Sequence, residues 1–176
     1  MSFHIRHATP DDVPTLARLH VHTFNETHGG GPSYELRERQ WREAFTVADG
    51  SWFCLVVEDD KGDLVAFAKG TPHDGGVPGC TGELNKIYAL RRVHRRGIGQ
   101  LLLCNVARQF LSQGVTSMLL FGEAKSPSNG FYEAFGGERL YGDSGEFHGG
   151  YGWRDLNLLL KRCDRKGTTT ATSHGH

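Results

Sequence analysis

The sequence lacks the features that mark membrane proteins and secreted proteins. No apolar run approaches the roughly 18 residues that a membrane-spanning helix needs. The first residues, MSFHIRHATPDD, contain no apolar core of the kind found in signal peptides. We therefore expect a cytoplasmic protein without a membrane partner.

The chain also lacks an excess of charge of either sign. Lysine and arginine together number 20, aspartate and glutamate also number 20, and the formal net charge is +0. A balanced charge creates no global field that would attract nucleic acid or an anionic membrane. Any basic cluster is therefore a local feature, and we expect no nucleic-acid partner.

Cysteine is sparse, and its spacing is not that of a metal site. The four cysteines, Cys54, Cys80, Cys104 and Cys163, lie in different segments and form no C-x-x-C pair. This pattern argues against a zinc site and against a disulfide framework. Cys54 and Cys104 stand in apolar patterns, so we expect buried thiols there and no nucleophilic role for Cys104.

The ten histidines invite a metal hypothesis, which their spacing does not support. His20 and His22 are two positions apart, and that spacing places them on different faces of a helix. We expect no metal.

Long linkers and internal repeats are absent, so the 176 residues are expected to form a single domain over residues 3–163. The small, polar end of the chain predicts a disordered tail at residues 164–176. Helical periodicity predicts helices over 9–24, 34–45, 99–113 and 126–135. Alternating or continuous apolar runs predict strands over 3–8, 51–59, 63–72, 79–90, 116–122, 139–143 and 149–161. This order indicates an α/β fold with one mixed sheet flanked by helices.

The segment between residues 87 and 111 combines a strand, a basic patch, two glycines and a helix. The patch contains Arg91, Arg92, Arg95 and Arg96. The start of a helix carries unpaired N–H groups and partial positive charge, so this junction predicts an anion site, most often one for phosphate. The alternative is a tight turn with solvated arginines.

Two common phosphate-binding motifs are excluded at this junction. No Lys-Ser/Thr pair follows the glycines, so the loop is not a P-loop. Leu102 stands where G-x-G-x-x-G requires its third glycine, which excludes the dinucleotide fingerprint.

Two motifs in a fixed order resemble those of a known family. The first motif, HRRGIG at residues 94–99, is similar to Q/R-x-x-G-x-G/A, with His94 in the first position followed by Arg95, Arg96, Gly97, Ile98 and Gly99. The second motif is FYEAFG, from Phe131 to Gly136. With a helix and a strand between them, they resemble the GNAT superfamily of acetyl-CoA-dependent N-acetyltransferases over roughly residues 3–161. The resemblance implies a single-domain α/β fold, with a mixed, mostly antiparallel central sheet flanked by about four helices.

The resemblance also implies a cofactor site. Ile87, Tyr88 and Ala89 would pair by their backbone with the pantetheine arm of acetyl-CoA, and Asn129 would lie near its distal part. The residues expected to wrap the pyrophosphate are His94, Arg95, Arg96, Gly97, Ile98, Gly99 and Gln100. Acetyl-CoA is thus the expected co-substrate.

Acetyl transfer requires a base, because the pKa of a primary amine is about 10. Glu83 lies four residues before Ile87, so a regular strand places both on one face, and the resemblance assigns this position to the general base, acting through water. The alternative is an ordinary charged strand end.

The leaving thiolate requires an acid. The resemblance assigns this role to Tyr132, whose phenol is protonated at neutral pH and can donate. The alternative for Tyr132 is aromatic packing. The N–H of Ala89 is the candidate to polarise the thioester carbonyl.

The acceptor is not specified by the sequence beyond a small-molecule or peptide amine. His28, Tyr34 and His148 stand in or beside Gly-rich loops that could border its cleft, whereas the three tryptophans are expected in the core. A homodimer is a further expectation, because many members of the family dimerise.

Other readings of the same motifs stay open. The first alternative is an acyl-CoA-binding module of the same fold without acceptor chemistry. Others are an acyltransferase for longer acyl groups or hydroxyl acceptors, and a phosphate-binding domain of another fold.

Overall fold

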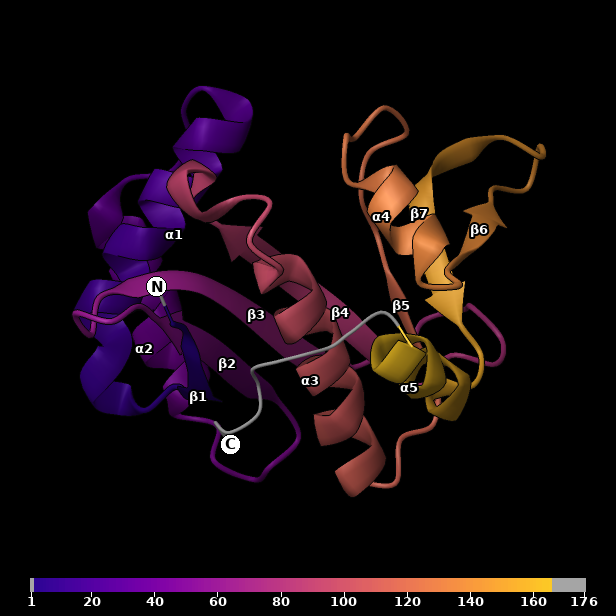
Figure 1. Ribbon diagram of the computed structural model, residues 1–176, viewed down its shortest axis with the longest axis horizontal. Coiled ribbons are helices and arrows are strands. Elements are labelled where there is room, and N and C mark those ends of the chain that lie inside the picture. Colours follow the sequence, from indigo (N-terminus) through magenta and orange to yellow (C-terminus); the bar gives the residue numbers. More distant parts are fainter. Residues whose placement is uncertain (1, 166–176) are drawn as a thin grey trace. The chain divides into compact units, whose positions relative to one another are not determined.

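The computed structural model describes residues 2–165, and Figure 1 colours its elements along the chain. The strands are β1 (His4–His7), β2 (Phe53–Glu58), β3 (Leu64–Pro72), β4 (Gly82–Ala89), β5 (Met118–Leu120), β6 (Glu138–Tyr141) and β7 (Phe147–Trp153). The helices are α1 (Val13–His28), α2 (Tyr34–Phe45), α3 (Ile98–Ser112), α4 (Asn129–Ala134) and α5 (Leu156–Arg165), with short 3-10 turns η1 (Pro10–Asp12) and η2 (Arg91–Val93).

The strands follow the order β1-β2-β3-β4-β5-β7-β6 in one mixed sheet. β4 and β5 pair in parallel, whereas β1 with β2, β5 with β7, and β6 with β7 pair antiparallel. This confirms the predicted α/β fold with a mixed, mostly antiparallel sheet and flanking helices. None of the helices within residues 2–165 is long and apolar enough to cross a membrane.

The chain divides into two compact units, each with its own core. We call residues 2–69 and 86–103 the first unit, and residues 70–85 and 104–165 the second unit. β4 and α3 each contribute residues to both units.

In the first unit, α1 packs against α2, and α1 carries an apolar stripe that is buried. The side chains of Val13, Leu16 and Leu19 are at most 5% exposed. They recur at the three-residue spacing of a buried helix face, as the sequence predicts. α1 ends at Gly29, whose φ of 79° is a left-handed conformation that glycine adopts without strain.

An ion network anchors the start of α1 to the strands. Arg6 on β1 donates to Asp12 at 2.8 Å and to Glu58 on β2 at 3.1 Å. The Arg6 hydrogen bond holds the pKa of Asp12 below its usual range. Asp12 also accepts from the backbone N–H of Thr9 at 2.8 Å, which fixes the turn into the helix.

In the second unit, β7 is the central buried strand. Tyr151 is 0% exposed and Trp153 3% exposed, and β6 pairs with β7 to form the hairpin seen in Figure 1. Gly82 on β4 allows α3 to approach, because a Cβ there would lie 2.9 Å from the ring of Phe110.

The end of the chain corrects one prediction. Residues 149–161 were expected as a strand, but β7 ends at Trp153 and α5 begins at Leu156. Leu156, Leu159 and Cys163 are buried, whereas Leu158 is 56% exposed. Buried positions with this spacing indicate a helix, but the nearly continuous leucines of LNLLLK do not reveal it in the sequence. α5 also includes residues 164 and 165 of the predicted tail, and residues 166–176 lie outside the described part of the chain.

A disulfide joins α3 to α5, which the sequence did not predict. Cys104 and Cys163 are bonded across a separation of 59 residues, with their Cα atoms 6.2 Å apart. Cys104 was expected to be a buried thiol; it is buried, but it is not free. Disulfides persist mainly in oxidising compartments, so this bond weighs against the expected cytoplasmic location, which stays a prediction.

Replacing both bridged cysteines by alanine is expected to lower the free energy of unfolding by about 2–4 kcal/mol, because the unfolded chain gains loop entropy. Urea unfolding followed by circular dichroism measures the change. Cys80→Ala, at a buried cysteine that forms no bridge, is the control for loss of a buried sulfur. An equal loss in the control and the double variant would mean that the crosslink itself contributes nothing.

Candidate active site

The loop between β4 and α3 contains two residues with positive φ directly before the helix. Arg95 has φ 65° and Gly97 has φ 80°, and α3 begins immediately afterwards at Ile98. Positive φ values that alternate with ordinary ones turn successive N–H groups toward one side, which favours binding of an anion. Ile98 is 3% exposed, so its side chain anchors the start of the helix.

The four arginines near the loop divide into two pairs. Arg91 donates its backbone N–H to Glu26 Oε1 at 2.8 Å, and Arg92 lies 3.4 Å from Asp59. These contacts tie the loop to α1 and to the turn between β2 and β3. Arg95 and Arg96 are exposed at the surface of the loop.

His94 closes the loop on itself. Its Nε2 lies 3.0 Å from the carbonyl oxygen of Ala89. A carbonyl oxygen only accepts, so the Nε2–H of His94 is the donor. The structure thus joins two of the predicted cofactor residues, and the His94 side chain supports the end of β4.

The side chain of Tyr88 belongs to an aromatic cluster inside the first unit. Its ring centroid lies 5.6 Å from that of Phe67 on β3, 5.8 Å from that of His20 and 6.3 Å from that of Phe24, the last two on α1. Trp41 on α2 completes the cluster and donates its indole N–H to Nδ1 of His20 at 3.1 Å. Ile87 and Ala89 flank Tyr88 at the end of β4.

Burial holds His20 neutral. It is 2% exposed, and burial together with the positive charges of Arg37, Lys86 and Lys69 lowers its pKa to about 3. The unfolded value is about 6.5, so between these two values the unfolded chain binds a proton that the folded chain does not. Folding stability therefore falls as the pH drops through this window.

We expect this linkage to remove about 2 kcal/mol of unfolding free energy between pH 7 and pH 5. His20→Gln keeps an acceptor for Trp41 and removes the titration, so its stability should change less over the same range. Urea unfolding of both proteins at the two pH values makes the comparison. Parallel pH dependence in both would show that His20 is not the group responsible.

Glu83 belongs to a polar cluster in the second unit. Oε1 of Glu83 lies 3.3 Å from Nδ1 of His73, and Oε2 accepts from Asn85 at 3.2 Å. The side chain of His73 is 10% exposed and that of Glu83 is 20% exposed. If Nδ1–H donates to the carboxylate, the buried Nε2 of His73 carries the lone pair, and Nε2 has no hydrogen-bond partner among the described residues.

Tyr132 lies on α4 among aromatic rings. It is 8% exposed, and its ring centroid lies 5.6 Å from that of Tyr151 and 6.1 Å from that of Trp153. Trp153 donates its indole N–H to the carbonyl oxygen of Phe135 at 3.0 Å, which fixes the end of α4. The packing that was the alternative for Tyr132 is therefore present, and it holds the ring without excluding a role for the hydroxyl.

Asn129 begins α4 and braces the loop before it. Its Nδ2 donates to the carbonyl oxygens of Glu123 and Ala124 at 3.1 and 3.0 Å. Its Oδ1 is buried and has no hydrogen-bond partner in the part of the chain that the structure describes.

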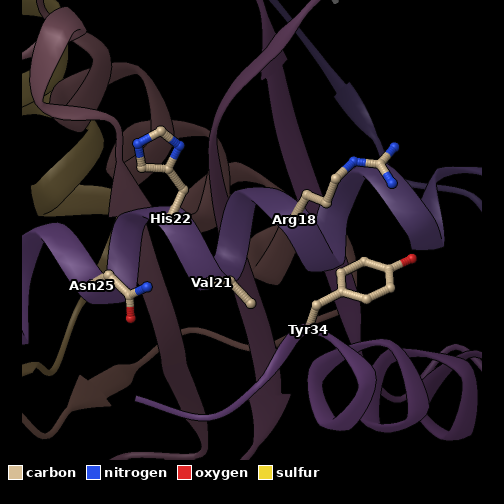
Figure 2. Close-up of a pocket in the computed structure, with 5 residues that line it drawn as sticks. All are labelled: Arg18, Val21, His22, Asn25 and Tyr34. Atoms are coloured by element: carbon tan, nitrogen blue, oxygen red, sulfur yellow. The ribbon is translucent and has the colours of Figure 1, made fainter. Parts of the chain in front are cut away.

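A hollow of about 480 Å³ lies on the outer face of α1. Figure 2 shows Arg18, Val21, His22 and Asn25 along this helix, with Tyr34 at the start of α2. The Arg18 guanidinium carbon lies 5.9 Å from the centre of the Tyr34 ring. Of the residues expected to border the acceptor, Tyr34 lines this hollow.

The other two residues expected at the acceptor cleft lie elsewhere. His28 packs against Phe24 with 4.3 Å between ring centroids, and His148 is exposed beside Glu146. His28 therefore adjoins the aromatic cluster of the first unit, and His148 belongs to the second unit. No group of three or more potential metal ligands occurs within residues 2–165.

Two residues with unusual surroundings were not predicted. His73 reaches Glu83 because the turn after β3 places its N–H 2.9 Å from the carbonyl oxygen of Thr81, a pairing that depends on the register of the hairpin. Arg37 is buried on α2. Its burial could have been predicted only from its position four residues before Trp41, which places both side chains on the same face of the helix.

Comparison with known proteins identifies the class. The model of the acetyltransferase (GNAT) family matches residues 13–137. The uncharacterized N-acetyltransferase YuaI of Bacillus subtilis (strain 168) is 30% identical over 175 residues, which cover 92% of this chain and 98% of YuaI. The chain belongs to the GNAT family and is an N-acetyltransferase, which implies an amine acceptor.

Solved structures confirm the fold. The PaiA N-acetyltransferase of Thermoplasma acidophilum, in complex with coenzyme A, matches with a TM-score of 0.68 and 18% identity, over 86% of this chain and 98% of its own. A GNAT acetyltransferase of Staphylococcus aureus Mu50 matches with a TM-score of 0.71 and 14% identity, over 88% and 99%.

Proposed function

We propose that the protein transfers the acetyl group of acetyl-CoA directly to a primary amine, without a covalent enzyme intermediate. The observation that carries the proposal is the loop at residues 94–100, with positive φ at Arg95 and Gly97 next to the start of α3. Backbone N–H groups and the helix dipole there fit a pyrophosphate, and the exposed Arg95 and Arg96 add charge. Coenzyme A in the related PaiA structure supports the same ligand.

The backbone at the end of β4 supports the remaining cofactor contacts. In the parallel register Gly82 pairs with Met118 and Glu83 with Leu119, and β5 ends at Leu120. β4 continues to Ala89, so β5 is too short to pair with its last residues. Backbone groups of Ile87 and Tyr88 and the carbonyl of Ala89 would pair with the pantetheine amides, which leaves the Ala89 N–H for the thioester.

Glu83 would serve as the general base. Its partner His73 holds one carboxylate oxygen at 3.3 Å and fixes the orientation of the side chain. A water between Glu83 and the acceptor would carry the proton away as the amine nitrogen attacks the thioester carbon. The Ala89 N–H would stabilise the oxyanion that forms at the carbonyl.

Tyr132 would complete the reaction as the general acid. When the carbon–sulfur bond breaks, the phenol O–H would protonate the thiolate, and the phenolate would regain its proton from solvent. The surrounding rings of Tyr151 and Trp153 hold the phenol ring in place. Asn129 would accept a hydrogen bond from the cofactor through its buried Oδ1.

Titration calorimetry with acetyl-CoA and with free CoA tests the proposal. We expect micromolar binding of both, followed by thiol release in a screen of primary amines. Tight binding with no thiol release from any amine would favour the acyl-CoA-binding module. Release with hydroxyl acceptors, or only with longer acyl-CoA, would favour the other acyltransferases. No binding by folded protein would refute the cofactor assignment.

Glu83→Gln is expected to lower kcat by about 100-fold while leaving the affinity for acetyl-CoA unchanged, because the amide keeps the shape but cannot accept a proton. Steady-state thiol release measures kcat, and calorimetry measures binding. Glu138→Gln, an exposed glutamate in the same unit, is the control and should retain full activity. A variant Glu83→Gln with normal kcat would remove Glu83 from the mechanism.

A further inference from the structure

α2 buries an arginine that has no carboxylate partner. Arg37 is 8% exposed, and its guanidinium carbon lies 4.9 Å from the centre of the Phe24 ring. Nη1 donates to Gln40 at 3.2 Å, whereas the buried Nε has no hydrogen-bond partner among residues 2–165. No ion pair between Arg37 and an acidic side chain occurs in that range.

The free edge of the guanidinium suits an anion. Arginine offers its Nε–H and one Nη–H side by side, at the spacing of the two oxygens of a carboxylate. Gln40 occupies Nη1, so the edge formed by Nε and Nη2 remains. A buried donor without a partner is unfavourable in the free protein, and a bound carboxylate would satisfy it.

A second cation without an acidic partner among the described residues lies on strand β3. Lys69, on β3, places its ammonium 5.5 Å from the centre of the Trp41 ring and 5.3 Å from that of Trp52. Like Arg37, it has no acidic partner among the described residues, and burial lowers the pKa of both groups. Aromatic faces attract these cations but do not neutralise their charge.

The side chain of His20, which lies near these cations, carries no negative charge. His20 is neutral, and its depressed pKa reflects the nearby positive charges of Arg37, Lys86 and Lys69. The Tyr88 hydroxyl also acts electrostatically on Arg37. The first unit therefore brings Arg37 of α2, Lys69 of β3 and Lys86 of β4 near the neutral His20 of α1.

We propose that Arg37, assisted by Lys69, binds a carboxylate on the acceptor, so that the substrate is a small amine that also carries a carboxylate. Phe24 and Tyr88 are half-buried beside Arg37 and would contact the carbon skeleton of such a molecule. Polyamines and strongly basic peptides would be repelled by the same charges. The proposal rests on the proposed acetyl transfer and adds the class of its acceptor.

The test uses matched acceptors and one substitution. The panel contains the free amino acids, their carboxamides and spermidine, with thiol release as the readout. We expect kcat/KM to be about 100-fold higher for the best carboxylate than for its carboxamide, as for a buried charge-paired contact. Arg37→Met should abolish this preference by lowering only the value for the carboxylate.

Arg42→Met is the matched control. Arg42 lies on the same helix, is exposed, and pairs with Glu38 at 2.8 Å, so its loss should leave the preference intact. Lys69→Gln should reduce the preference by about 10-fold, because an ammonium does not form the bidentate contact that a guanidinium can form with a carboxylate.

Two readouts separate binding from a structural role. Methionine removes a buried, uncompensated charge, so Arg37→Met should melt at the same temperature as the wild type or at a higher one. If Arg37 served only to stabilise the fold, the variant would melt at a lower temperature than the wild type. The fluorescence of Trp41 and Trp52 should respond to the preferred carboxylate in the wild type and not in Arg37→Met.

The outcomes are distinct. If acetyl-CoA fails to bind, the proposed function is wrong. The fluorescence titration then still shows whether a carboxylate binds to the protein in an Arg37-dependent way. If acetyl-CoA binds and amines react, but carboxamides serve as well as carboxylates, the Arg37 proposal is wrong. It is equally wrong if Arg37→Met and Arg42→Met behave alike, or if no carboxylate of the panel reacts or changes the fluorescence in an Arg37-dependent way.

Discussion

Replacing Gly99 by tryptophan is expected to abolish the binding of acetyl-CoA while the protein stays folded. Gly99 is the second residue of α3, directly after the loop whose backbone turns at Arg95 and Gly97. A glycine allows a phosphate to approach the helix start closely, and an indole there would occupy the space of the pyrophosphate. We expect the affinity to fall at least about 100-fold, since several N–H contacts are lost together.

Calorimetry with acetyl-CoA measures this loss, and circular dichroism checks the fold. Ser112→Trp is the matched control, because it adds the same side chain to the other end of the same helix, at an exposed position. The control should bind normally. If Gly99→Trp also binds normally, the pyrophosphate is held elsewhere, and the loop is a turn with solvated arginines.

Replacing Tyr132 by phenylalanine is expected to lower kcat by about 100- to 10,000-fold, the range for loss of a general acid. Phenylalanine keeps the ring contacts with Tyr151 and Trp153, so the aromatic packing around this position should change little. The affinity for acetyl-CoA should be preserved, because the hydroxyl acts on the departing sulfur. Thiol release under saturating substrate measures the effect.

Tyr151→Phe provides the control for Tyr132. Tyr151 lies beside Tyr132 and donates its O–H to Glu133 at 2.6 Å. Its loss should lower the free energy of unfolding by about 1 kcal/mol through that hydrogen bond and leave the rate unchanged. A normal rate for Tyr132→Phe would reduce Tyr132 to a packing residue and leave protonation of the thiolate to water.

Much of the fold follows from local patterns in the sequence. The apolar spacing of α1, the turn between β2 and β3, and the glycine after α3 each act within a few residues, so they could be predicted. In that turn Asp59 Oδ1 accepts from the N–H groups of Lys61 and Asp63, which is a local interaction. The two family motifs are local as well, and they sufficed to predict the class of enzyme.

The chain's last helix shows where local patterns fail. The run LNLLLK fits a strand as readily as a helix when its neighbours are unknown, and the burial of Leu156, Leu159 and Cys163 decides for the helix. The bond between Cys104 and Cys163 follows from the packing of α5, because two cysteines 59 residues apart pair only where the fold brings them together.

The sequence by itself determined most of the elements and their order, because propensity, capping and glycine conformation act over short distances along the chain. The residues expected to hold acetyl-CoA follow from the resemblance of two motifs to those of a family, and they stay a prediction. Only the tertiary structure decided which groups surround them. It placed His73 against Glu83, enclosed Tyr132 among aromatic rings, and buried Arg37 without a carboxylate. Contacts of this kind depend on packing between elements that are distant in the chain, and burial changes the energy of a charge far more than sequence position does.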